Sequence, residues 1–188
     1  MDILSAFGLS ASAGLNAYIP MLVVSLLARF TDIIELSGNW EALESWWVIG
    51  LLAVLSLVEF FADKIPAVNH INDAIQTFIR PTAGAILFAV SANVITEIHP
   101  VLSIAAGLLV AGTVHVVKSA VVRPALTITT GGAADAPVSV LEDIVATLMS
   151  VLAVVLPIVL GIVLVILAVW LIWWYSTRAS RSRNRLES

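Results

Sequence analysis

Acidic and basic side chains recur at helical spacing inside segments that are otherwise apolar. Glu59 and Asp63 lie four residues apart and share one face of a helix, as do His115 and Lys118 at a step of three. An ionisable group at the centre of a membrane helix costs roughly 2.5–3.5 kcal/mol, so such groups indicate a functional site when they lie deep. The side chains that we expect to line an ion or substrate path are Asn16, Glu59, Asp63, Lys64, His115, Lys118, Glu142 and Asp143.

These charges permit two interpretations. A balanced set of charges can be an ion-pair network that only locks the helix bundle. It can also be a coupling site in which Glu59 or His115 carries a proton, because histidine titrates near neutral pH. Asn16 would then mark the mid-membrane part of the path. The charges that balance are Glu59, Asp63, Glu142 and Asp143 against Lys64, Arg80, Lys118 and Arg123.

A second candidate site would bind an anion. Residues 127–137 are rich in Thr, Gly and Ala, and Gly131-Gly132 permits backbone conformations closed to other residues. Pro137 then opens a helix whose N-terminus favours an anion. An ordinary loop with a helix cap explains the same residues. The anion-binding candidates are Arg80, Arg123, Thr130, Gly131 and Gly132.

Motifs for metal or nucleophilic chemistry are absent from the sequence. It has no Cys, no HExxH and no GxSxG, and its three histidines (His70, His99 and His115) are far apart. We therefore expect no cofactor, assign no metal, and consider binding better supported than catalysis.

Composition places the chain in a membrane. Of its 188 residues, 60% are hydrophobic and 12% are charged, and the mean hydropathy is +1.05. Soluble domains contain about 45–50% apolar and about 25% charged residues, and disordered chains are more polar still. We expect an all-α, polytopic helical membrane protein with one transmembrane domain at 1–177 and a basic cytoplasmic tail at 178–188. The charge pattern does not indicate a nucleic-acid partner.

The apolar stretches predict five or six membrane crossings, with six preferred. The last one, from Val138 to Tyr175, is nearly twice as long as a bilayer requires at about 1.5 Å per residue. The loop 30–45 is acidic, whereas 118–136 and the tail carry Lys and Arg, which favours a cytoplasmic location. Both basic segments are cytoplasmic only if 138–175 crosses twice, which gives six crossings with both termini cytoplasmic. One long helix kinked at Pro157 gives five.

Two further patterns concern the architecture. Ile71, Ile75 and Phe78 recur at helical spacing among polar residues, which predicts an interfacial or re-entrant amphipathic segment near 68–80. The similarity of Ser12-Ala13-Gly14 to Thr82-Ala83-Gly84 indicates a possible weak internal repeat. Transporters are often built from repeats with a site between them, although generic membrane composition explains so short a match equally well.

Several motifs resemble one known family. They are Gly14-Leu-Asn-Ala-Tyr-Ile-Pro20, Glu59-Phe-Phe-Ala-Asp-Lys-Ile-Pro66, Ile79-Arg-Pro-Thr-Ala-Gly84, His115-Val-Val-Lys118, Arg123-Pro124, Thr130-Gly-Gly132 and Ser139-Val-Leu-Glu-Asp143. In this order, over residues 8 to 157, they resemble the bacterial membrane proteins catalogued as domain of unknown function 4126. The sequence departs from that pattern at Asn69 and at Asp135-Ala136. The resemblance implies a multi-pass protein of the bacterial inner membrane and implies no activity.

Three functions fit these observations. The leading hypothesis is a small transporter or channel for an ion or small polar solute, with the C-terminus cytoplasmic. The second is a membrane enzyme or lipid-handling protein that binds a phosphate-bearing lipid. The third is a structural or assembly subunit without a ligand. The expected partners are the lipid bilayer, the solute, and further copies of the chain in a homodimer or larger homo-oligomer.

Overall fold

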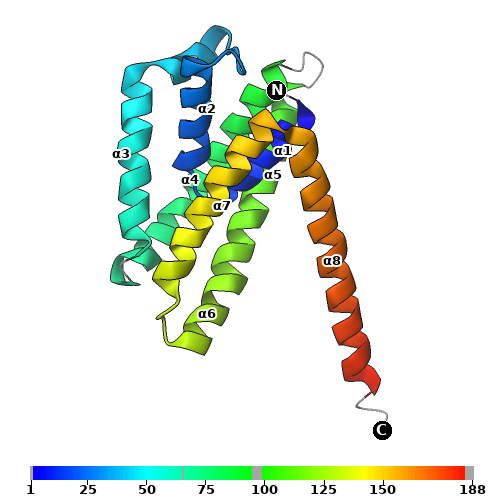
Figure 1. Cartoon of the computed structure of the whole chain (residues 1–188). Helices are drawn as coiled ribbons and strands as arrows, with labels where there is room; N and C mark the ends of the chain where they lie inside the picture. Colours follow the sequence, from blue (N-terminus) through cyan, green and yellow to red (C-terminus); the bar gives the residue numbers. More distant parts are fainter. Residues whose placement is uncertain (1, 65, 95–98, 185–188) are drawn as a thin grey trace.

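The computed structural model describes residues 2–64, 66–94 and 99–184, with side chains at 2–64, 71–92, 99–170 and 172–174. The described residues form an all-α bundle without strands, as predicted (Figure 1). The elements are α1 (Ile3–Leu15), α2 (Tyr18–Phe30), the 3-10 helix η1 (Gly38–Glu44), α3 (Trp46–Ala62), α4 (Pro66–Val94), α5 (Pro100–Val117), the π-helix η2 (Lys118–Val122), α6 (Arg123–Thr130), α7 (Asp135–Val155) and α8 (Pro157–Asn184).

The first apolar stretch forms a helical hairpin. Asn16 leaves helical geometry, with φ −145° and ψ 127°, and its side-chain Oδ1 accepts hydrogen bonds from the backbone N–H groups of Tyr18 and Ile19. In Figure 1 α1 descends into the bundle and α2 returns beside it, so the start of α1 and the end of α2 lie at the same end. Each helix has 13 residues. At about 1.5 Å per residue, neither spans the roughly 30 Å hydrocarbon core.

The number of crossings differs from the preferred prediction. Four described segments are long and apolar enough to cross a membrane, namely 71–92, 100–130, 135–155 and 157–174. A fifth results if η1 and α3, bent by 60°, count as one span. The last apolar region divides at Pro157 as expected. The remaining expected crossing is the first apolar stretch, which instead forms the α1–α2 hairpin (Figure 1).

The amphipathic segment near 68–80 is the first part of α4, which continues through Pro81 to Val94. Its apolar residues Ile71, Ile75 and Phe78 are exposed, whereas Gln76 and Arg80 are buried. The periodicity therefore turns apolar side chains outward and polar ones into the bundle, the reverse of a helix on a water-soluble core.

The segment after the fourth apolar stretch is also helical. Residues 127–130, the first part of the segment expected as a loop, belong to α6, which continues α5 and η2, so the helical run ends at Thr130. The turn that follows uses Gly131 and Gly132 at φ +64° and +87°, a left-handed conformation that glycine adopts without a steric cost. The π-helix begins at Lys118, which is the first charged residue of the continuous helical segment 100–130.

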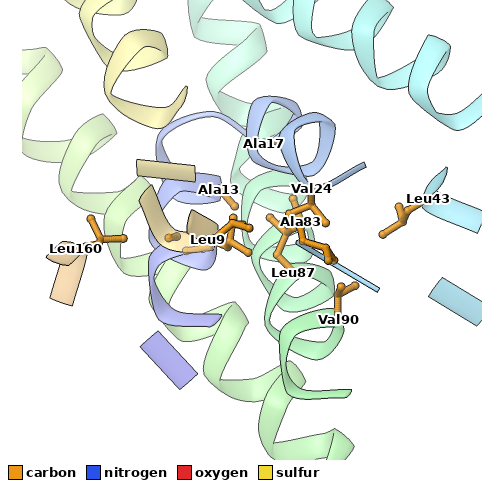
Figure 2. Close-up of a cluster of buried hydrophobic side chains, with 13 residues drawn as sticks. Leu9, Ala13, Ala17, Val24, Leu43, Ala83, Leu87, Val90 and Leu160 are labelled. Atoms are coloured by element: carbon orange, nitrogen blue, oxygen red, sulfur yellow. The ribbon is translucent and has the colours of Figure 1, made fainter. Parts of the chain in front are cut away.

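The hydrophobic core surrounds the hairpin. Leu9, Ala13 and Ala17 pack against Ala83 and Leu87 of α4 (Figure 2). Hydroxyl groups tie the same helix to its neighbours: Ser10 donates to the Gly84 carbonyl at 2.9 Å, and Ser12 donates to the Ala146 carbonyl at 2.8 Å. Small residues allow these close backbone approaches, which are the usual basis of helix packing in membranes.

Candidate functional site

Charged side chains from α3, α4, α5–η2–α6 and α7 meet at the tip of the α1–α2 hairpin. The sequence separates these residues by as much as 84 positions, from Glu59 to Asp143, yet they lie together, most of them linked by ion pairs into one set and Lys64 with Asp143 forming a pair beside it. All eight expected path residues lie in this group, which we call the charge network. It also includes Arg80, Arg123 and Asp73.

Glu59 and Arg80 form the most deeply buried pair of the network. Their side chains are 1% and 0% exposed. Arg80 donates to Glu59 Oε1 twice, from Nη2 at 2.9 Å and from Nε at 3.3 Å. The second oxygen of the same carboxylate, Oε2, is buried without a hydrogen-bond partner. Arg80 therefore hydrogen-bonds to only one of the two oxygen atoms of the carboxylate that it neutralises.

Asp63, the residue that follows α3, is the centre of the network. Its Oδ2 lies 3.0 Å from Arg123 Nη2, 3.6 Å from Arg80 Nη2 and 3.8 Å from Lys118 Nζ. Its Oδ1 accepts a hydrogen bond from Asn72 Nδ2 at 2.6 Å. Burial alone would raise the pKa of Asp63, but the three cations and the Asn72 amide together hold it below its usual value. Asp63 is therefore the firmly ionised anchor of the network.

Lys118 connects the network to the end of α1. Its Nζ lies 2.8 Å from Glu142 Oε2 and donates to the Leu15 carbonyl at 2.9 Å. Leu15 is the last residue of α1, whose terminal carbonyls have no partners within the helix and carry partial negative charge. The same ammonium thus stabilises both a carboxylate and the break in the hairpin.

Asn16 and Asp143 join the network to the tip of the hairpin. The Asn16 amide caps α2 through Oδ1 and donates through Nδ2 to Asp143 Oδ1 at 3.0 Å. Asp143 Oδ2 forms an ion pair with Lys64 Nζ at 3.7 Å, which is too long for a hydrogen bond. Lys64 also donates to the Phe60 carbonyl at 2.8 Å.

The hydrogen bonds of His115 identify it as a neutral imidazole. Its Nδ1 lies 3.2 Å from Arg80 Nη1, and its Nε2 lies 3.1 Å from Thr77 Oγ1. A guanidinium can only donate, so Nδ1 accepts, and the ring proton is on Nε2, from which it is donated to Thr77. The Thr77 hydroxyl in turn donates to the Asp73 carbonyl. A second proton on His115 would place it against the Arg80 donor and break this contact.

The connected part of the network carries one excess negative charge. In the described part of the chain, four carboxylates are linked by ion pairs to three cationic side chains, and Lys64 with Asp143 forms a separate neutral pair. With His115 neutral, four against three leaves one negative charge. The linked residues are Glu59, Asp63, Asp73 and Glu142, with Arg80, Lys118 and Arg123.

The anion-binding candidates fall into two places. Arg80 and Arg123 lie in the network, where carboxylates already contact them. Thr130, Gly131 and Gly132 lie at the exposed turn between α6 and α7. There the Asp135 carboxylate, in the first turn of α7, accepts from Thr127 at 3.3 Å and places a negative charge beside the helix N-terminus. The side chain of Asn69, a departure from the family pattern, lies outside the described residues.

Several residues of the site were not predicted. They come from the first half of α4: Asn72, Asp73 and Thr77 contact Asp63, Arg123 and His115, respectively, and Gln76 is buried. Their steps of three and four toward Arg80 were a usable signal. The mean hydropathy of this polar segment does not indicate a membrane-crossing helix and therefore conceals its buried face. Within the described residues, no three His, Asp or Glu side chains are arranged to hold a metal ion.

The comparisons with known proteins agree with the sequence resemblance. A family model described as Domain of unknown function (DUF4126) matches residues 3–177. No curated protein and no solved structure matches the chain significantly.

Proposed function

We propose that this chain, which belongs to the DUF4126 family, is a small transporter or channel for an ion or small polar solute. The description of the family assigns no activity. The observation that carries this proposal is the contact between the charge network and a helix break inside the bundle. Lys118 reaches the last carbonyl of α1, and Asn16 joins the start of α2 to Asp143.

Broken helices support the proposal on physical grounds. Backbone without helical hydrogen bonds is tolerated at membrane depth only where protein or a polar path satisfies it. In transporters the free ends of half-helices contribute partial charges to the substrate site. The hairpin presents a carbonyl end from α1 and an amide end from α2 at one place, and polar side chains of the network already contact both.

The energetic cost of the network supports a functional role. Replacing a buried ion pair by apolar residues is often neutral or stabilising, by about 1–4 kcal/mol. Stabilisation of the helix bundle alone would therefore not require this many buried charges. In the proposed mechanism Glu59 or His115 carries a coupled proton. Protonation of His115 breaks its contact with Arg80 and frees that guanidinium to move between carboxylates.

Flux through purified protein tests the proposal. The full chain is reconstituted into liposomes, gradients of Na⁺, K⁺, H⁺, chloride and phosphate are imposed one at a time, and the lumen is followed with a pH dye and ion-selective electrodes. We expect a flux that is lost in Glu59→Gln and in His115→Ala. The control is Glu35→Gln, which removes the same charge from an exposed loop residue and should retain the flux. Unchanged flux in both network variants would contradict the proposal.

A second candidate function is lipid handling, and a cleft between α2, α3 and α4 favours it. The cleft has a volume of about 420 Å³ and is lined almost entirely by apolar side chains, among them Met21, Leu52, Leu55 and Ile79. Such a cleft accepts a lipid chain. Transfer or consumption of a phosphate-bearing lipid by the same liposomes, without ion flux, would favour this function over transport.

A further inference from the structure

Two deeply buried oxygen atoms near the Glu59–Arg80 pair lack hydrogen-bond partners. They are Glu59 Oε2 on α3 and Gln76 Oε1 on α4, and the two residues are 1% and 2% exposed. Both atoms are acceptors when Glu59 is ionised. An unpaired buried acceptor loses its hydration without a compensating hydrogen bond, so two of them in one region require an explanation.

Tyr18 connects the two residues. It is the first residue of α2, and its phenol lies within electrostatic range of the Gln76 side chain and of the Glu59 carboxylate. Three oxygen-bearing side chains from three helices therefore gather at the start of α2.

The charge of the surroundings gives the sign of a ligand. The linked network holds four carboxylates and three cations. Glu59 and Asp73 each have a single cationic partner and one buried oxygen without a hydrogen bond, and the side chain of Glu59 is the more deeply buried, at 1% exposed against 20%. A buried, uncompensated negative charge is expensive, whereas one added positive charge makes the network neutral. The charged and titratable groups around Glu59 are Arg80 from α4, Asp63 directly after α3, Lys118 from η2 and Tyr18 from α2.

We infer that Glu59 Oε2, Gln76 Oε1 and the Tyr18 hydroxyl form a binding site for one monovalent positive charge, supplied by a sodium ion or by a proton. A sodium ion is coordinated by the three oxygens. A proton on Oε2 converts an unpaired acceptor into a donor for a neighbouring oxygen. The inference deepens the proposed function, because the bound charge is the ion that a transporter would move or use for coupling.

The neighbourhood favours a single charge over a divalent metal. The Arg80 guanidinium already neutralises Oε1 of the same carboxylate, so a doubly charged ion would meet strong repulsion. Divalent cations also require several carboxylate or imidazole ligands, and no such group is found among the described residues.

The test is thermal unfolding of the purified full chain in detergent, measured as Tm. Sodium, potassium and choline chloride are compared at equal ionic strength and over a series of pH values. The variants are Glu59→Gln and Gln76→Leu, with Glu35→Gln as the control. A neutral Gln at position 59 still accepts from Arg80, and its amide N–H replaces the bound proton. We therefore expect Glu59→Gln to be at least as stable as the wild type without sodium.

Each outcome decides the inference. A saturable rise in Tm with sodium but not choline, retained in Glu35→Gln and lost in the two site variants, identifies sodium. Equal Tm in all salts, with a wild-type Tm that falls as pH rises and a flat Glu59→Gln profile, identifies the proton. No dependence on sodium or pH, with Glu59→Gln less stable than the wild type throughout, would overturn the inference. Liposome flux is measured separately, so a protein that binds the charge without flux refutes only the transport proposal.

Discussion

The helices α1 and α8 are both apolar, but they occupy opposite environments. Beyond its exposed first turns, α1 is covered by protein, and its buried residues are mostly Ser, Gly and Ala. α8 is richer in large aliphatic and aromatic residues, yet most of its described side chains, such as Ile166 and Ile172, are exposed. In water the more apolar helix would be the buried one. In a bilayer burial follows close approach and hydrogen bonding instead, so the polar and small residues mark the interior.

The largest effect should come from removing the cation at the centre of this interior. In Arg80→Leu, Glu59 and Asp63 remain as buried carboxylates, Glu59 having no cation within ion-pair distance. Leaving a buried charge unpaired costs about 3–5 kcal/mol. We expect a loss of that order in the free energy of unfolding, measured by denaturant titration in detergent. A loss as small as that of a surface substitution would show that the network does not stabilise the bundle.

Acid should weaken the interior and spare α8. The pKa of Asp63 is below its usual value in the folded chain. The stability that it contributes is therefore fully present above the ordinary aspartate pKa of about 3.9 and is lost as the pH falls through the lowered folded-state value. Tm measured against pH should fall steeply there in the wild type. The variant Asp63→Asn should be less stable at neutral pH and should lack this component of the fall.

Two glycines of α5 allow a matched test of close packing. A Cβ at Gly107 would lie 2.6 Å from the Ala85 Cα atom, whereas one at Gly112 would have Pro81 Cγ as its nearest atom, at 3.7 Å. Overpacking typically costs about 1–3 kcal/mol, so Gly107→Ala should lower the free energy of unfolding by this amount. Gly112→Ala should change it by less than about 0.5 kcal/mol. Equal effects would contradict the described contact between α4 and α5.

Single substitutions with small effects on the free energy of unfolding should still distinguish α1 from α8. Ser12→Ala removes a hydroxyl that bonds to the Ala146 carbonyl and to Ser150. Hydrogen bonds between membrane helices contribute about 0.6 kcal/mol on average. Leu167→Ala on α8, where the side chain is half exposed, should change unfolding by less than about 0.5 kcal/mol in detergent. The comparison between the helices fails if Leu167→Ala proves the more damaging substitution.

Much of the site could be predicted from the sequence because helical spacing decides which residues share a face. Glu59 with Asp63, and His115 with Lys118, were placed on common faces, and the structure brings both pairs into one network. The division of the last apolar region at Pro157 followed from the positions of Lys and Arg.

The hairpin was not predicted because only a few residues at the break indicate it, whereas the hydropathy of the whole stretch indicates one continuous helix. An apolar stretch of suitable length predicts a crossing whether or not the backbone breaks inside it. The available cue was Asn16 four residues before Pro20, since a proline lacks the N–H that would bond to the Asn16 carbonyl in a continuous helix. The buried polar face of α4 was missed because hydropathy averages over both faces. Only tertiary contacts show that Gln76 and Arg80 point inward.

The most direct test of the central claim, that the network is an ion site and not only a lock, compares stability and flux in one variant. Glu59→Gln is purified, its free energy of unfolding is measured at neutral pH without sodium, and the same preparation is assayed in liposomes. The account predicts a protein as stable as the wild type that no longer carries the ion. A variant that unfolds as readily as Arg80→Leu, or one that transports at the wild-type rate, would contradict it.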